Sequence, residues 1–129
     1  MRPSAASLIA RAKQALADGD TGAARSWVNQ ALRADPVVRD LAAAHLLLAD
    51  ARLVEKRPDE AISAYREVAR RHGRTPEGET ALFALGQLLV ERGRPAEAAA
   101  AFHDYLARYP MGRFLREVRE RIEQVQPSH

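Results

Sequence analysis

The chain repeats itself with a period of 37 residues, and this repetition constrains its fold more than any other feature. The stretch GRPAEAAAAF (93–102) follows KRPDEAISAY (56–65) at that offset, and KRPDEAISAY follows GDTGAARSWV (19–28) at the same offset. Each stretch begins with a turn, has alanine at its sixth position and ends in a larger side chain. A fixed period of about 20–50 residues is typical of a solenoid, in which each structural unit packs against the next.

The repeat aligns small and large residues in columns. Small residues let neighbouring helices approach closely, so we expect helix contacts at the small positions and expect the larger side chains to fill the space between successive units. The small columns are Ala12, Ala49 and Gly86, and Ala24, Ala61 and Ala98; the large column is Val28, Tyr65 and Phe102. Within the alanine run only Ala98 is assigned a contact, and Ala99 to Ala101 are predicted to be helix formers whose exchange matters little.

Apolar residues recur at helical spacing along the whole chain, and β-branched residues are sparse, which predicts an all-α fold. Turn-forming residues divide the chain into about seven helices of ordinary globular length. The breaks fall at DGD (18–20), DP (35–36), RP (57–58), HGR (72–74), GRP (93–95) and YP (109–110).

The repeated pattern resembles the tetratricopeptide repeat, whose unit is a pair of antiparallel helices of about 34 residues. The family's large, small, turn and closing positions are matched by Leu82, Leu85, Gly86, Gly93, Ala98, Phe102 and Pro110. The second unit departs from the family pattern, because Lys56 replaces the turn glycine and Gly73 replaces the closing proline. The resemblance implies an α-solenoid of three hairpins within a single domain (1–129), with repeats near 4–36, 41–73 and 78–110.

A further helix is expected over 112–126. Phe114, Val118, Ile122 and Val125 form one apolar stripe on it, as in the end helix that covers the last face of a repeat array. The stretch FHDYLARYPMGRFLREVRERI also resembles tetratricopeptide proteins of the bacterial envelope, such as the TolA-binding coordinator and the outer-membrane assembly lipoproteins.

The residues indicate no catalytic chemistry. The chain contains no cysteine, which excludes disulfides, thiolate metal sites and a cysteine nucleophile. The four histidines, His45, His72, His103 and His129, lack metal-ligand spacing, and His103 and Asp104 are neighbours that point about 100° apart on a helix. There is no glycine-rich phosphate loop. We therefore expect no enzyme activity, no metal and no cofactor.

The resemblance implies a binding groove instead. In the family, the first helices of the hairpins line a concave surface that holds a partner segment. The positions that correspond are Ile9, Lys13, Leu46, Asp50, Leu53, Phe83, Gln87 and Val90. The family's carboxylate clamp is missing, because Ile9 and Leu46 stand where polar residues would be expected. The sequence therefore favours a protein–protein interaction module, an adaptor or scaffold, that holds an apolar or amphipathic peptide or helix; alternatively, the apolar row is part of the core.

Two other functions remain open. One is homo-oligomerisation through the same apolar row or through an uncapped end of the array. The other is nucleic-acid binding through two arginine clusters, one within 66–74 and one within 113–121, in a chain of net charge +3. We do not favour the latter, because cations stabilise helix C-termini and glutamates neutralise the last helix.

The N-terminus lacks a continuous apolar segment, since Arg11 and Lys13 interrupt it. No run approaches the ~18 apolar residues that span a bilayer. We expect a soluble protein without membrane insertion, cytoplasmic as the sequence is given, or periplasmic if it is a domain of a larger envelope protein.

Overall fold

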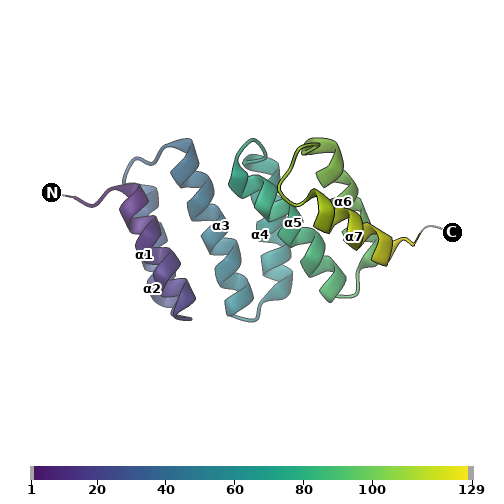
Figure 1. Ribbon diagram of the computed structural model, residues 1–129. Coiled ribbons are helices and arrows are strands. Elements are labelled where there is room, and N and C mark those ends of the chain that lie inside the picture. Colours follow the sequence, from purple (N-terminus) through teal and green to yellow (C-terminus); the bar gives the residue numbers. More distant parts are fainter. Residues whose placement is uncertain (1, 128–129) are drawn as a thin grey trace. The chain divides into compact units, whose positions relative to one another are not determined.

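The structure is a computed structural model that describes residues 2–127. Within this range the chain forms seven helices and no strand (Figure 1). The predicted all-α helical-repeat fold is confirmed. The helices are α1 (Ala5–Ala17), α2 (Thr21–Arg33), α3 (Val38–Val54), α4 (Pro58–Arg71), α5 (Pro76–Glu91), α6 (Pro95–Arg108) and α7 (Leu115–Val125).

The chain divides into two compact units, Met1–Ala64 and Tyr65–His129. The first unit contains α1, α2, α3 and the first half of α4. The second unit contains the rest of α4 together with α5, α6 and α7. The boundary lies within α4, and each unit is described by itself below.

The turns that join the paired helices share one backbone geometry. The first helices end at residues 17, 54 and 91 and the second helices begin at residues 21, 58 and 95, so both sets keep the 37-residue period. One residue in each turn is left-handed, with φ of 78° at Gly19, 59° at Lys56 and 71° at Gly93. The amide of the following residue then donates to the carbonyl five positions earlier, over 2.8–2.9 Å. This is a Schellman ending, and Lys56 adopts it without being glycine.

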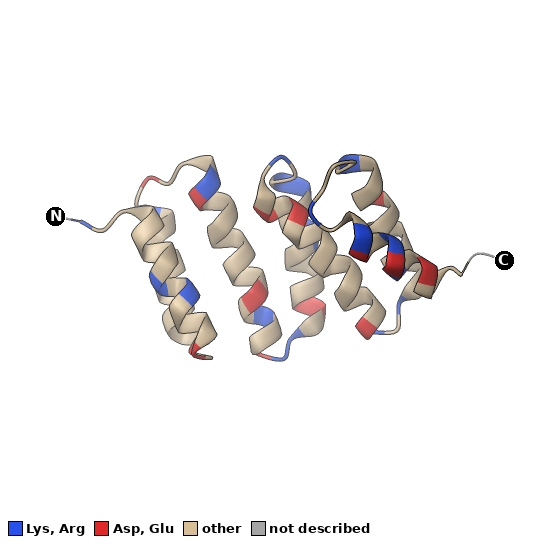
Figure 2. Ribbon diagram, in the orientation of Figure 1, with Lys and Arg blue, Asp and Glu red and all other residues tan. Residues whose placement is uncertain are grey.

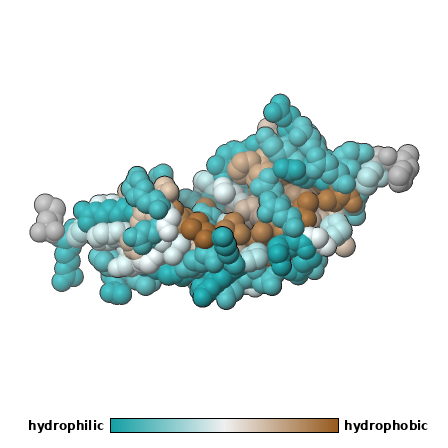
Figure 3. All heavy atoms as spheres, turned by 90° about the horizontal axis from the view of Figure 1, so that it is seen from below, coloured by the Kyte–Doolittle hydropathy of each residue, from teal (hydrophilic) through white to brown (hydrophobic). Residues whose placement is uncertain are grey.

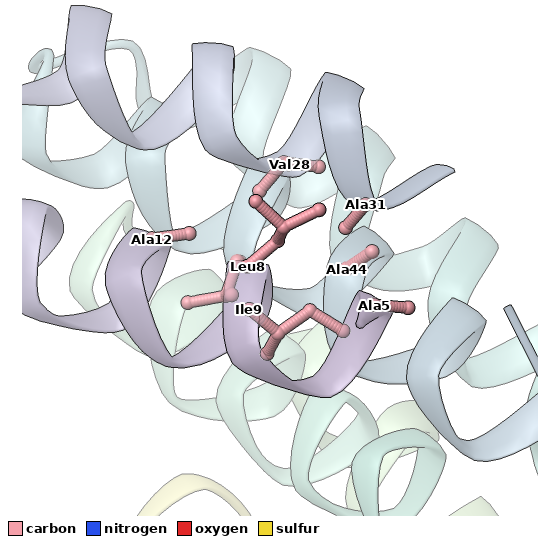
Figure 4. Packing of buried hydrophobic residues seen from close by; sticks show 8 residues of the cluster. Ala5, Leu8, Ile9, Ala12, Val28, Ala31 and Ala44 are labelled. Carbon is pink, nitrogen blue, oxygen red and sulfur yellow. The ribbon is translucent and has the colours of Figure 1, made fainter. Parts of the chain in front are cut away.

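The core of the first unit joins α1, α2 and α3. Figure 4 shows Leu8 of α1 beside Val28 of α2, with small side chains from all three helices around them. Alanines at the contact positions let the helix backbones approach, while leucine, isoleucine and valine fill the remaining volume. The cluster consists of Ala5, Leu8, Ile9, Ala12, Val28, Ala31, Ala44 and Leu47.

The columns predicted from the repeat are confirmed by burial. All nine residues of the two small columns and the large column are buried, and none of the eight that have a side chain is more than 2% exposed. In the second unit, the ring of Phe102 lies against Gly86 of its own hairpin. The large side chain therefore contacts the small residue of its own hairpin.

The prediction for Ala99–Ala101 was wrong for two of the three residues. Ala99 is 1% exposed and Ala101 is 8% exposed, and only Ala100 is exposed to solvent. The physical reason is that α6 packs against both α5 and α7. A helix with two neighbours buries more of its circumference than a helix with one, so alanines flanking the predicted contact are buried as well.

The expected end helix is present as α7, which packs against α6. Val118 is fully buried, and Phe114, Ile122 and Val125 are half-buried, so the predicted apolar stripe faces the protein. Among residues 2–127, none of the helices is both long enough and apolar enough to cross a membrane.

Candidate binding surfaces

In the first unit, the predicted groove residues lie on α1 and α3, which contact each other. Leu46, Asp50 and Leu53 follow the i, i+4, i+7 spacing that places them on one face of α3. Leu46 and Asp50 are half-buried, Leu53 is 39% exposed, and Lys13 of α1 is exposed. This surface, which we call the α1–α3 face, combines apolar side chains with one cation and one carboxylate.

Ile9 differs from the other groove residues of the first unit. Its side chain is only 5% exposed and belongs to the core cluster of α1, α2 and α3. For this residue the structure matches the alternative in which the apolar row is part of the core. The accessible part of the α1–α3 face therefore begins one turn further along α1, at Lys13.

The last turn of α3 presents apolar side chains to solvent. Leu53 is 39% exposed and the adjacent Val54 is 44% exposed, and the face drawn in Figure 3 carries apolar surface between hydrophilic areas. Glu55 comes next and accepts two hydrogen bonds from Arg25 of α2, at 2.5 and 3.1 Å. That hydrogen-bonded pairing lowers the pKa of Glu55 and holds the two charges together at the C-terminal end of α3.

In the second unit, Phe83, Gln87 and Val90 lie on α5 and are half-buried. The ring of Phe83 is stacked on the ring of Phe114, with centroids 4.5 Å apart and planes 9° from parallel. The segment that leads into α7 therefore covers one of the predicted groove residues. The predicted stripe on the end helix contained Phe114, but its contact with Phe83 was not foreseen.

A polar network fastens the same segment to α5. The hydroxyl of Tyr105 donates to Oε2 of Glu79 at 2.5 Å, and the amide of Arg113 donates to the same oxygen at 2.7 Å. The amide of Phe114 donates to the Tyr105 hydroxyl at 2.8 Å. Burial, followed by the hydrogen bond to Glu79, raises the pKa of Tyr105 to about 12. Sequence reasoning missed this network, because its partners are 26 and 34 residues away from Glu79.

Several arginines of the two clusters form ion pairs. Arg70 pairs with Glu67 at 2.6 Å, and Arg113 pairs with Glu79 at 3.5 Å. Along α7, Figure 2 shows cationic and anionic residues interspersed. This arrangement is typical of a solvated helix surface.

His103 and His72 lie in different surroundings. Nε2 of His103 lies 3.0 Å from Oε1 of Gln126, while Asp104 pairs with Arg108 at 3.0 Å, so His103 and Asp104 engage different partners. His72 is 7% exposed, and burial lowers its pKa. No group of three histidine, aspartate or glutamate side chains within residues 2–127 is placed to hold a metal ion. His129 lies outside the described residues.

The paired helices, the shared turn geometry and the buried small columns define an all-α helical-repeat solenoid. The family model described as the tetratricopeptide repeat matches residues 9–72 and 46–112, and the chain belongs to this family. Its repeats generally mediate protein–protein interaction, and the fold is typically a non-catalytic interaction module.

Solved structures share the fold, and one of them does so over nearly the whole chain. It is a tetratricopeptide-like protein from Chlorobium tepidum TLS, 19% identical, with a TM-score of 0.64. The match covers 95% of this chain and 94% of that protein. No curated protein matches the chain.

Proposed function

We propose that the chain is a non-catalytic adaptor whose α1–α3 face holds an apolar or amphipathic peptide or helix from a partner protein. The observation that carries the proposal is the exposed apolar end of α3, where Leu53 and Val54 are open to solvent. Within the second unit, taken by itself, Gln87 and Val90 of α5 are the proposed contacts, because Phe83 is already stacked on Phe114.

The composition of the face favours an amphipathic partner. Leu46 and Leu53 offer apolar contact, and Lys13 and Asp50 flank them with charges of opposite sign. An amphipathic helix buries apolar residues at i, i+3 and i+4 and presents polar residues beside them. Such a helix could bury its apolar stripe on the leucines while its polar edge meets Lys13 and Asp50.

The proposal is tested by capturing partners from the native cell with two matched variants. Leu53→Glu places a charge on the α1–α3 face and should abolish capture, because a buried unpaired carboxylate opposes an apolar contact. Val37→Glu is the control: Val37 is 66% exposed and lies just before α3, at the end of the helix far from Leu53. Both variants should keep the helical circular dichroism of the wild type. Equal capture by the two variants would contradict the proposal.

Self-association through the same face is the competing outcome. Light scattering over a range of protein concentrations distinguishes it, because a homo-oligomer grows in mass with concentration whereas an adaptor for another protein stays monomeric. If the mass rises with concentration in the wild type but not in Leu53→Glu, the partner on this face is a second copy of the chain.

A further inference from the structure

The second unit contains a concave site of its own. It is a cleft of about 410 Å³ bordered by α4, α5 and α6. Leu82 and Leu85 of α5, each 3% exposed, form its apolar floor. We call it the α4–α6 cleft.

Alanines keep this cleft open. Ala69 of α4 lines one wall, and Ala100 and Ala101 of α6 line the other. A methyl group at each of these positions leaves space that a longer side chain would fill. The alanine run of α6 therefore provides one wall of the cleft, in addition to the helix contact made by Ala98.

Two polar contacts join the walls across the cleft. Arg66 of α4 pairs with Glu97 of α6 at 3.6 Å. The guanidinium of Arg108 of α6 donates to the backbone carbonyl of Ala69 of α4 at 3.4 Å. Both contacts are long for their kind, so Arg66 can turn toward another acceptor at little cost, whereas Arg108 is also held by Asp104 at 3.0 Å.

The rim of the cleft has more hydrogen-bond donors than acceptors. Three arginines line it, and each guanidinium carries five N–H donors; Arg66, Arg70 and Arg108 have side chains that are 55%, 70% and 45% exposed. The two carboxylates on the rim are already engaged. Glu97 accepts two hydrogen bonds from Arg94, at 2.7 and 3.0 Å, and Asp104 pairs with Arg108 at 3.0 Å. Arg70 in turn donates to Glu67 at 2.6 and 3.1 Å. Each rim guanidinium thus has one carboxylate partner and keeps further N–H donors, which favour an anionic ligand.

We propose that the α4–α6 cleft binds an acidic segment of a partner protein, in which one apolar side chain enters the cleft and flanking carboxylates meet the rim arginines. Arginine forms bidentate hydrogen bonds with carboxylates, and the leucine floor supplies the apolar contact. This site is separate from the α1–α3 face and uses none of its residues.

The test uses the full chain, labelled with ¹⁵N, and the acetylated, amidated peptide Glu-Glu-Leu-Glu-Glu as the probe. We expect saturable shifts of the Ala69, Leu85, Ala100 and Ala101 amides at peptide concentrations up to about 10 mM, a range that suits a weak single-anchor contact. The same peptide with lysine in place of glutamate, or with serine in place of leucine, should shift them at least about tenfold less, since each lost contact is worth roughly a factor of ten.

Matched variants locate the binding. Ala100→Phe fills the cleft from an exposed position and should weaken the probe at least about tenfold, since it removes the space for the leucine side chain. Ala107→Phe is the control, because Ala107 is exposed on the same helix and does not line the cleft. Arg70→Gln removes a rim charge without reversing it and should weaken the probe severalfold.

Three results would overturn the proposal. The first is the absence of saturable shifts at these amides, and the second is equal binding by the glutamate and lysine peptides. The third is loss of binding in Leu53→Glu with retention in Ala100→Phe, which would move the probe to the α1–α3 face. Because Leu53→Glu should leave probe binding unchanged, failure of this site and failure of the proposed adaptor face give different patterns.

Discussion

Gly86 of α5 lies directly against the aromatic ring of Phe102 on α6. A methyl group at Gly86 would lie 2.7 Å from Cδ1 and 2.8 Å from Cζ of that ring, which is closer than van der Waals contact allows. The repeat columns predicted a small residue at 86 and a large one at 102, and the structure joins the two in one contact. Close packing of α5 and α6 therefore depends on the absence of a side chain at Gly86.

Gly86→Ala should lower the free energy of unfolding by about 1–3 kcal/mol, because overpacking outweighs the gain in helix propensity. Gly22→Ala is the matched control, since Gly22 is also helical and a methyl group there would meet only Oδ1 of Asp20 at 3.7 Å. The control should leave stability unchanged or raise it by up to about 1 kcal/mol. Urea unfolding followed by circular dichroism measures both, and an equal response would contradict the assigned contact.

Lys56→Gly should stabilise the protein by about 0.5–1 kcal/mol. Lys56 is left-handed, with φ of 59°, and this conformation costs a residue with a side chain about 1–2 kcal/mol. Glycine removes that cost, but it also makes the unfolded chain more flexible, which offsets part of the gain in stability. Lys56→Ala separates backbone strain from loss of the lysine side chain, because alanine keeps the strain. Thermal unfolding should rank the glycine variant above both wild type and the alanine variant. A glycine variant less stable than wild type would contradict this account of the turn.

The alanine run offers a test of which helix faces are buried. Ala98 is fully buried, so Ala98→Leu should destabilise the protein by about 1–3 kcal/mol through overpacking. Ala100 is exposed, so Ala100→Glu should change stability by less than about 0.5 kcal/mol. If the two substitutions have the same effect on urea unfolding, the helical register of α6 is wrong.

Ala99→Glu tests the correction made by the structure. Ala99 is 1% exposed although it adjoins the exposed Ala100. A glutamate there would bring an unpaired charge into an apolar contact, at a cost of several kcal/mol. Ala99→Glu and Ala100→Glu introduce the same side chain one residue apart, so a large difference in unfolding free energy is expected between them. A small difference in unfolding free energy would instead support the prediction from sequence that exchange of Ala99 matters little.

The raised pKa of Tyr105 makes stability depend on pH in the alkaline range. The folded-state pKa is about 12 and the ordinary value is 10.0, so the folded protein holds the proton more tightly than the unfolded chain. The stabilisation is complete below pH 10 and is lost as the pH rises toward 12. The difference in pKa corresponds to a free energy on the order of 3 kcal/mol.

Tyr105→Phe removes this titration together with the hydrogen bonds to Glu79 and Phe114. At neutral pH it should cost about 1–3 kcal/mol, because buried polar groups lose their partner. Between pH 10 and 12 the stability of the variant should fall less steeply than that of the wild type. The comparison controls for the other groups that titrate in this range, because both proteins contain them. Parallel pH profiles of the two proteins would contradict the role assigned to Tyr105.

The repeat columns could be read from sequence because each rests on three independent copies of one position. The fold class, the positions of the helix breaks and the buried columns all followed from that redundancy. Even the substitution of Lys56 for glycine was visible as a departure at a known turn position. A single residue is a weak indication of structure, but the same residue type at three equivalent positions indicates one packing geometry.

The parts that sequence did not predict lie where the chain stops repeating. Glu79 reads as a solvated helix residue, yet it accepts hydrogen bonds from groups 26 and 34 residues later. The cover that Phe114 places on Phe83 depends on where the segment before α7 packs, and the burial of Ala99 and Ala101 depends on the neighbours of α6. These contacts occur once in the chain, so no column reveals them. The residues of the α1–α3 face other than Ile9 stay a prediction.

The central claim, that the α1–α3 face holds a partner, is tested most directly by site-specific photo-crosslinking in the native cell. A photoreactive amino acid in place of Leu53 should give a discrete cross-linked partner band, and the same amino acid in place of Val37 should give none, since both positions are exposed and only Leu53 lies on the face. Identical bands from both positions, or a band from position 37 alone, would contradict the account.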